Sequence, residues 1–294
     1  MVYYVNMKLN EVVFITSSES PHLSASDSLL ITPLRKKEII VRALPWDDLE
    51  IDWTRFTSII LRSCWNYHYN YPLFLKWLWK LKEKHVQLWN PIDVVIWNSN
   101  KKYLRDLENK GIPTIPTVWV SQKEKIELEI ISKDKGWKDM VIKPCVGASA
   151  HEIIKASFGA YISAQIKIDE LVQKTDVMIQ PLMHEVITEG EYSLIFIDGE
   201  FSHAILKRPK KGDFRSNYHY GATKKKVTLD KRFISQALNI LKTIESPLLY
   251  ARVDGIRRKD TFILMELELI EPHLFFDHDS QSPIRFAEAL AGKI

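Results

Sequence analysis

Cysteine is scarce in this chain of 294 residues, which has only Cys64 and Cys145. Two cysteines are too few for a disulfide scaffold, and their spacing matches no zinc-binding pattern. The sequence therefore predicts a protein of a reducing compartment, the cytoplasm.

Long apolar runs are missing as well. No stretch reaches the roughly 18 apolar residues that a membrane-spanning helix needs, and residues 1–10 lack the basic start and apolar run of a signal peptide. Charge of one sign is not in excess, because 41 Lys and Arg face 37 Asp and Glu, for a net charge of +4. The composition therefore predicts neither a membrane nor a nucleic acid as a partner.

Material for a hydrophobic core is present in quantity. Hydrophobic residues make up 46% of the chain, and nine of them are Trp, which bury large apolar areas. The length exceeds that of a usual single domain, so we expect two or three closely packed subdomains.

The first 110 residues predict a small α/β domain. Short β-branched and apolar runs, which predict strands, alternate with segments of helical spacing. The expected elements are strands at 11–16, 38–44 and 56–61 and helices at 26–34 and 71–84. This alternation favours a parallel sheet.

Two α+β units are expected next, over 111–185 and 186–294. A helix over 98–110, capped by Asn98 or Ser99 and stopped at Gly111, leads into the first. Asp198-Gly199 is a two-residue hairpin signal in the second. Strands are expected at 117–120, 140–143, 177–180, 192–197, 201–206, 248–254 and 262–269, and helices at 231–244 and 283–290.

Lys143 ends an apolar run and is followed by the small residues 146–150. A lysine at the end of a strand can neutralise phosphate oxygens, and small residues let backbone N–H groups approach them. Taken alone, the pattern is more often that of a surface lysine before a turn.

A second apolar strand ends in Gln180-Pro181-Leu182-Met183. The backbone of such a strand end can offer donors and acceptors to a purine edge. An ordinary strand end has the same pattern, so this segment gains meaning only in combination.

Three carboxylates are expected to meet on two paired strands. Glu266 and Glu268 point to one face because strand side chains alternate with period two, and Asp254 lies on the preceding strand. Like charges this close repel unless a cation joins them. An oxygen-rich cluster of this kind suits Mg²⁺, whereas the alternative is a solvated strand face.

The order of these features resembles the ATP-grasp superfamily, in particular the branch of bacterial glutathione synthetase and O-ureido-serine cyclase, the cycloserine-forming ligase. The matching segments extend across nearly the whole chain, at 62–68, 90–91, 97–104, 111–117, 142–144 and 265–272. The resemblance implies an ATP-grasp fold, in which a parallel-sheet domain precedes two α+β subdomains that enclose ATP.

The resemblance also implies roles for the nucleotide and metal residues. Lys102 and Lys143 match the two ATP lysines, Ser149 lies in the phosphate flap, Gln180, Pro181, Leu182 and Met183 match the adenine hinge, and Glu191 matches the ribose ligand. Asp254, Glu266 and Glu268 match the metal-binding set, although many relatives have Asn at the position of Glu268. The implied metal is Mg²⁺, with Mn²⁺ as an alternative.

Basic residues are the candidates for contacts with the phosphoryl group and the substrate. The resemblance implies that Arg252 and Arg215 neutralise the transferred phosphoryl group, and an arginine suits this role because it can bind an anion with two N–H groups. It also implies that Lys207 and Arg208 contact the substrate, but an exposed basic loop would look the same. Arg62, Ser63 and Asn66 follow the third strand, where ligands of open α/β sheets bind.

The implied function is ATP-dependent ligation of a carboxylate to an amine or related nucleophile through an acyl phosphate. The implied substrate is a small amino-acid-like acid. A ligase that modifies proteins and a non-catalytic nucleotide-binding protein remain alternatives. Relatives are often dimers, so a homodimer is also compatible with the resemblance.

Overall fold

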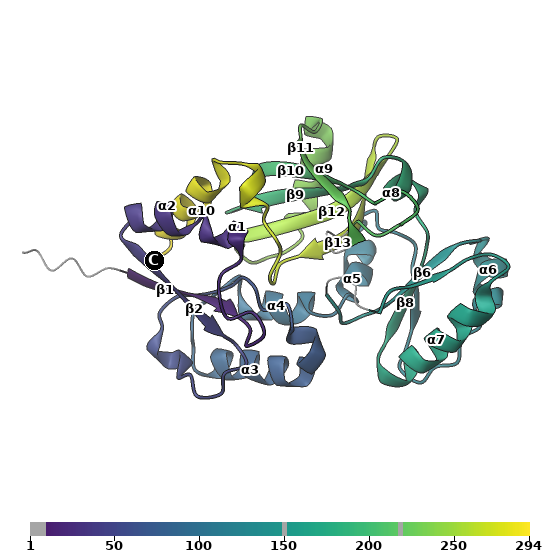
Figure 1. Cartoon of the computed structure of the whole chain (residues 1–294), viewed down its shortest axis with the longest axis horizontal. Coiled ribbons are helices and arrows are strands. Elements are labelled where there is room, and N and C mark those ends of the chain that lie inside the picture. The colour runs from purple at the N-terminus through teal and green to yellow at the C-terminus, as the bar shows by residue number, and fades with distance from the viewer. Residues whose placement is uncertain (1–9, 149–151, 217–219) are drawn as a thin grey trace, which may run out of the picture.

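The computed structural model describes residues 10–148, 152–216 and 220–294, which form three parts (Figure 1). Each part is built on its own sheet. The predicted fold class, a parallel-sheet domain followed by two α+β units, is confirmed.

The N-terminal part contains a parallel sheet with strand order β2-β1-β3-β4. Its strands are β1 (Asn10–Thr16), β2 (Ile39–Pro45), β3 (Ile59–Leu61) and β4 (Leu88–Trp89). Its helices are α1 (Ala25–Ser28), α2 (Ile31–Lys36), α3 (Tyr71–Glu83), α4 (Ile92–Asn98) and α5 (Tyr103–Asn109), with the 3₁₀ turns η1 (Trp53–Arg55) and η2 (Tyr67–Asn70). The helix expected over 26–34 is therefore two short helices, and the one expected over 98–110 begins at Tyr103.

The middle part, which we call the lid, is an antiparallel sheet with order β5-β8-β6-β7. It contains β5 (Val118–Val120), β6 (Met140–Pro144), β7 (Ile154–Ala156), β8 (Val177–Pro181), α6 (Leu128–Lys135) and α7 (Tyr161–Lys174). The core of the lid is its own, because its buried cluster draws only on residues between 118 and 179.

The C-terminal part is an antiparallel sheet with order β11-β10-β9-β12-β13. Its strands are β9 (Glu191–Ile197), β10 (Glu200–Arg208), β11 (Thr223–Val227), β12 (Tyr250–Arg258) and β13 (Thr261–Glu268). The helices are α8 (His184–Thr188), α9 (Lys231–Leu241) and α10 (Ser282–Ala291), with the 3₁₀ turn η4 (Phe276–His278). The hairpin expected at Asp198-Gly199 is confirmed, and both residues have positive φ.

The N-terminal and C-terminal parts share their cores. Helix α10 packs beside α2, and Phe286 joins Phe14 of β1 in one buried cluster (Figure 1). On the other face of the C-terminal sheet, α9 packs with residues of α4 and α5. These two parts therefore form a common body, and the lid projects from it.

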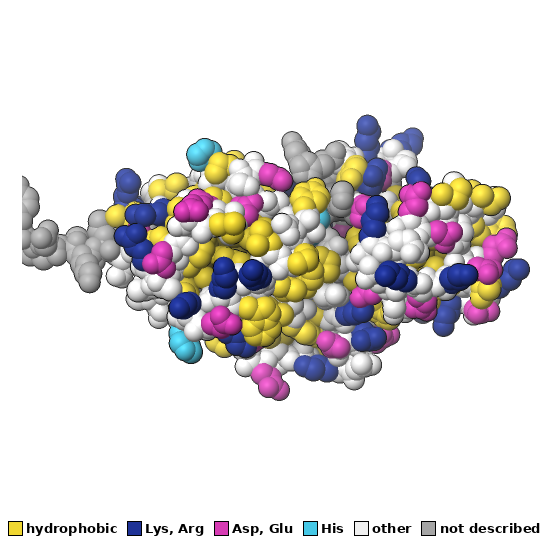
Figure 2. Space-filling view, turned by 90° about the horizontal axis from the view of Figure 1, so that it is seen from below, with side chains coloured by type: hydrophobic (Ala, Val, Ile, Leu, Met, Phe, Trp, Pro, Cys, Tyr) yellow, Lys and Arg dark blue, Asp and Glu magenta, His cyan; other side chains and the backbone are white. Residues whose placement is uncertain are grey.

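The surface mixes charges of both signs. On the underside shown in Figure 2, Lys and Arg side chains are interspersed with Asp and Glu among the described residues, without a continuous basic stripe. No helix in the described ranges is long and apolar enough to cross a membrane.

Candidate active site

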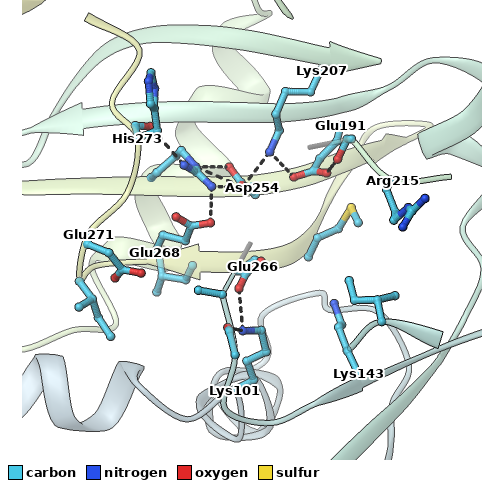
Figure 3. Close-up of a pocket in the computed structure, with 18 of the residues that line it drawn as sticks. Lys101, Lys143, Glu191, Lys207, Arg215, Asp254, Glu266, Glu268, Glu271 and His273 are labelled. Atoms are coloured by element: carbon cyan, nitrogen blue, oxygen red, sulfur yellow. Dashed lines mark hydrogen bonds and ion pairs between the residues drawn. The ribbon is translucent and has the colours of Figure 1, made fainter. Parts of the chain in front are cut away.

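A cavity of about 870 Å³ lies where the three parts meet. The lid contributes Lys143 and the segment from Gln180 to Met183, and the α4–α5 connection contributes Lys101. The floor is the charged half of one face of the C-terminal sheet (Figure 3), with Glu191, Lys207, Arg252, Asp254, Glu266 and Glu268.

Alternation along the strands separates these charges from the core. Leu194 of β9 and Val253 of β12 face the buried cluster under α9, whereas Glu191 and Asp254 face the cavity. Side chains one residue apart point to opposite faces of a sheet. The charged side chains therefore lie on one face although apolar neighbours flank each of them.

A β-bulge in β13 is needed for this arrangement. The register between β12 and β13 shifts after Asp254, so that Asp254 pairs with Glu266 but Gly255 pairs with Leu264. Leu264 and Leu267 consequently face the same core, while Glu266 turns to the cavity. Gly255 is required here, because a Cβ at this position would lie 2.4 Å from the carbonyl oxygen of Ile263.

The charges on the floor alternate in sign across four strands. Lys207 Nζ donates to Glu191 Oε1 at 2.6 Å and to Asp254 Oδ2 at 3.0 Å. Arg252 donates through Nε to Asp254 Oδ1 at 3.0 Å and through Nη2 to Glu268. Each cation therefore joins two carboxylates, and the floor is a connected network.

The network shifts the titration of its members. Burial acts to raise the pKa of Asp254, but Arg252 and Lys207 outweigh it and hold that pKa well below its usual value. Burial raises the pKa of Glu268 to about 7, with Glu266 and Asp254 adding to the effect and Arg252 opposing it. At Glu268, therefore, the positive charge of the network does not fully balance burial and the neighbouring carboxylates.

The expected three-carboxylate metal site stays a prediction, and it is not preformed in the structure. Within the described ranges, no three His, Cys, Asp or Glu side chains are placed to hold one metal ion. Asp254 is bonded instead to Arg252 and Lys207. Glu266 and Glu268 nevertheless point into the cavity (Figure 3). Their oxygen atoms fit a hard divalent cation that takes its other ligands from phosphates and water.

Lys101, rather than the expected Lys102, points into the cavity. Lys101 Nζ lies 3.1 Å from Glu266 Oε1, and its side chain is 13% exposed. Burial acts to lower the pKa of Lys101, but Glu266, Glu268 and Glu271 outweigh it, so this pKa is raised. Lys102 lies outside the cavity lining and pairs with Asp176 of the lid at 2.6 Å, with 37% of its side chain exposed.

Two side chains beside Lys101 explain its position. Asn98 exchanges hydrogen bonds with the main chain of β13, donating to Leu267 O at 2.8 Å and accepting from Leu269 N at 2.9 Å. Tyr103 accepts from Leu267 N at 2.8 Å. We call this pair the Asn98–Tyr103 clamp. It holds the segment between them against β13, which places Lys101 next to Glu266.

Lys143 enters the cavity from the lid. Among the described residues, no carboxylate forms an ion pair with it. Burial, together with the nearby Lys101, lowers the pKa of Lys143. An anion bound between Lys101 and Lys143 would supply a negative charge that both ammonium groups can contact.

The strand end from Gln180 to Met183 also lines the cavity. Gln180 Nε2 donates to Thr117 Oγ1 at 2.9 Å, and Leu182 N donates to Asp139 O at 2.9 Å. The N–H of Met183 has no acceptor among the described residues. This N–H therefore remains for a ligand at the hinge.

Arg215 lies on the loop between β10 and β11 and lines the cavity. It pairs with Asp213 at 2.8 Å, and its guanidinium group lies 3.5 Å from the centre of the Tyr220 ring. Ser216, next in the chain, donates to Glu191. The loop is thereby attached to the charged floor.

Comparison with known proteins decides the family. The sequence model described as "Prokaryotic glutathione synthetase, ATP-grasp domain" matches residues 109–270, more than half of the chain. This chain belongs to the ATP-grasp family. A second model, "D-cycloserine synthetase DcsG, N-terminal domain", matches residues 12–90.

Individual ATP-grasp relatives agree with this membership. The "Cycloserine biosynthesis protein DcsG" of Streptomyces lavendulae is 27% identical over 90% of this chain and 92% of its own length. A "Glutathione synthetase" of Prochlorococcus marinus is 27% identical over 56% of this chain and 52% of its own. The crystal structure of D-cycloserine synthetase DcsG superposes with a TM-score of 0.86 at 26% identity, covering 97% of this chain and 99% of that one.

Several expected substrate residues of this ATP-grasp chain lie outside the cavity lining. Arg62 is buried and bonded to Asp27 at 2.8 Å and to Pro272 O at 3.0 Å. Asn66 bonds to Trp46 and Asp47. Ser63 is fully buried, and none of the three reaches the cavity. Arg62 and Asn66 support the N-terminal part, because Asp27, Trp46, Asp47 and the main chain at Pro272 are their hydrogen-bond partners.

Two other expected residues have different outcomes. Arg208 is exposed, donates to Glu189 O at 2.9 Å and does not line the cavity, because it follows Lys207 and points to the opposite face of β10. Ser149 lies outside the described residues.

The sequence reasoning did not select Lys101 or Glu271, both of which line the cavity. Both occur in segments that were part of the resemblance. Only their positions in the folded structure distinguish them from the other residues of those segments.

Proposed function

We propose that this ATP-grasp ligase uses ATP to phosphorylate the carboxylate of a small amino-acid-like substrate and then joins the acyl group to an amine or a related nucleophile. The products are ADP, phosphate and the ligated acid. One observation carries the proposal: two lysines from separate segments, Lys101 and Lys143, line the same cavity as the two carboxylates of β13 (Figure 3).

Nucleotide binding follows from the lining. The hinge from Gln180 to Met183 takes adenine, with the free N–H of Met183 as a donor. Glu191 lies on the floor where it can accept from ribose hydroxyls. Lys101 and Lys143 bind the phosphates, since both line the cavity and Lys143 forms no ion pair with a carboxylate among the described residues.

The transferred phosphoryl group would lie above the network on the floor. Glu266 and Glu268 would hold a Mg²⁺ ion, or Mn²⁺ in its place, which would supply charge neutralisation at the phosphate oxygens. Arg252 is fixed by Asp254 and Glu268 at the cavity wall, so its positive charge is held in place beside the proposed phosphoryl site. Arg215 can approach from its loop, because its only carboxylate partner is the neighbouring Asp213 within the described residues.

The catalytic contribution is therefore positioning and electrostatics. Catalysis of this kind requires no covalent bond between the chain and the substrate. Since ATP is a reactant, we also place the reaction in the cytoplasm.

The test is ADP release from ATP and Mg²⁺ with a panel of L- and D-amino acids. We expect at least one acid to stimulate release. Glu266→Gln should abolish at least 99% of that stimulated release while ADP binding is retained, and Glu245→Gln, the same change at an exposed position outside the cavity, should leave it unchanged.

Two results would contradict this proposal. If no acid stimulates ADP release by the folded wild-type chain, the ligase reaction is wrong. If Glu266→Gln turns over at the wild-type rate, the metal assignment is wrong.

A further inference from the structure

Glu271 lies at one end of the cavity, away from Lys143 and Arg215 (Figure 3). It follows β13 by three residues. The cavity wall around this end includes Trp65, Tyr67 and Ile270. Lys143 and Arg215 therefore lie toward one end of the site and Glu271 lies toward the other, with Lys101 between them.

Glu271 differs from the other carboxylates of the floor in its partners. Glu191, Asp254, Glu266 and Glu268 each contact a cationic side chain. In the described ranges, no Lys, Arg or His side chain forms an ion pair with Glu271. Burial raises the pKa of Glu271 to about 8 and Glu268 adds to that rise, while the charges of Lys101 and Arg252 oppose it.

The N-terminal part fixes the backbone that carries this carboxylate. Trp65 Nε1 donates to Glu271 O at 3.3 Å, and Arg62 Nη2 donates to Pro272 O at 3.0 Å. Arg62 is itself held by Asp27 in the buried interior. The segment from Arg62 to Asn66, in which substrate-binding residues were expected, thus holds the backbone of Glu271 and Pro272 by hydrogen bonds. Its effect on a substrate is therefore indirect and goes through Glu271.

We propose that Glu271 binds the ammonium group of an amino-acid substrate and so selects the amino acid over the corresponding amine-free acid. This inference rests on the ligase function proposed above. An ammonium group supplies the missing positive charge and donates up to three hydrogen bonds. The aromatic rings of Trp65 and Tyr67 also line this end, and such rings attract a cation.

Substrate pairs test the inference without any variant. ADP release by the wild type is measured with each active amino acid and with its amine-free counterpart. Loss of a hydrogen bond between charged groups costs about 1.5–3 kcal/mol, so the amine-free acid should have a KM about 10- to 150-fold higher. Equal KM values for the two acids would overturn the inference.

Variants test the residue. Glu271→Gln should raise the KM of the amino acid by a similar factor, leave the KM of ATP within about twofold and remove the preference over the amine-free acid. Glu271→Asp keeps the charge and should recover part of the affinity. Glu288→Gln, at an exposed position of α10, is the matched control and should behave like the wild type.

The outcomes separate the two proposals. If Glu271→Gln leaves the KM of the amino acid unchanged, or changes only the Mg²⁺ or ATP requirement, Glu271 is not the ammonium ligand although the ligase function stands. If no amino acid stimulates ADP release by the wild type, the proposed function itself is wrong. Should Glu271→Gln not fold, the wild-type substrate pairs and Glu271→Asp still decide.

Discussion

Replacing Lys101 by Met should weaken nucleotide binding far more than replacing its neighbour Lys102 by Met. Both changes remove one positive charge and keep an unbranched side chain. Lys101 is 13% exposed and faces the cavity beside Glu266, whereas Lys102 is 37% exposed and pairs with Asp176 on the lid.

The magnitude follows from these environments. A hydrogen bond between charged groups contributes about 1.5–3 kcal/mol, so Lys101→Met should raise the Kd of ATP or ADP about 10- to 150-fold. The Lys102–Asp176 pair is partly exposed and should contribute about 0–1 kcal/mol to stability, with little effect on the nucleotide.

Isothermal titration with ADP and Mg²⁺ measures both variants against the wild type. Circular dichroism must first show that each is folded, because Lys101 also donates to Gly147 O at 2.6 Å and its loss costs some stability. A Kd that rises equally in both variants, or only in Lys102→Met, would refute the assignment of Lys101 to the phosphates.

Three further outcomes can be measured. Asp27→Ala should lower the free energy of unfolding by about 3–5 kcal/mol in urea denaturation, because it leaves the buried Arg62 without its carboxylate; a loss below about 1 kcal/mol would show that the pair is not buried in solution. Gly190→Ala should destabilise by more than about 1 kcal/mol, since φ is +120° and a Cβ would lie 2.6 Å from Lys207 O; an unchanged melting temperature would contradict that contact. The pKa of Glu271 is raised in the fold, so from about pH 4.5 to 8 the unfolded chain loses this proton while the folded chain keeps it. Wild-type stability should therefore fall relative to Glu271→Gln as pH rises through this window, and melting temperatures that stay parallel would argue against the raised pKa.

Strand periodicity was sufficient to predict part of the site. The alternation in 262–269 placed Glu266 and Glu268 on one face, and both line the cavity. The bulge beside Gly255 could not be predicted, because it depends on how close Ile263 of the neighbouring strand approaches. The bulge also explains why the alternation of side chains changes phase within β13, so that Leu264 and Leu267 both face the core.

Choices between neighbouring residues needed the tertiary structure. Lys101 and Lys102 both precede α5, so no helical face distinguishes them. The clamp on β13 decides, and it joins residues more than 160 positions apart. Likewise, Arg62 follows a parallel strand where ligands often bind, but Asp27 and the main chain at Pro272 use its guanidinium.

The Asn98–Tyr103 clamp has a consequence for self-association. It covers the outer edge of β13 together with Pro113, whose carbonyl accepts from Leu264 N at 2.8 Å. Along this stretch the edge cannot add a strand from another molecule. The opposite edge strand, β11, carries three consecutive lysines, 224–226, and lysines on an edge discourage strand pairing. If two copies associate, we therefore expect them to meet through helices or loops and not by extending this sheet.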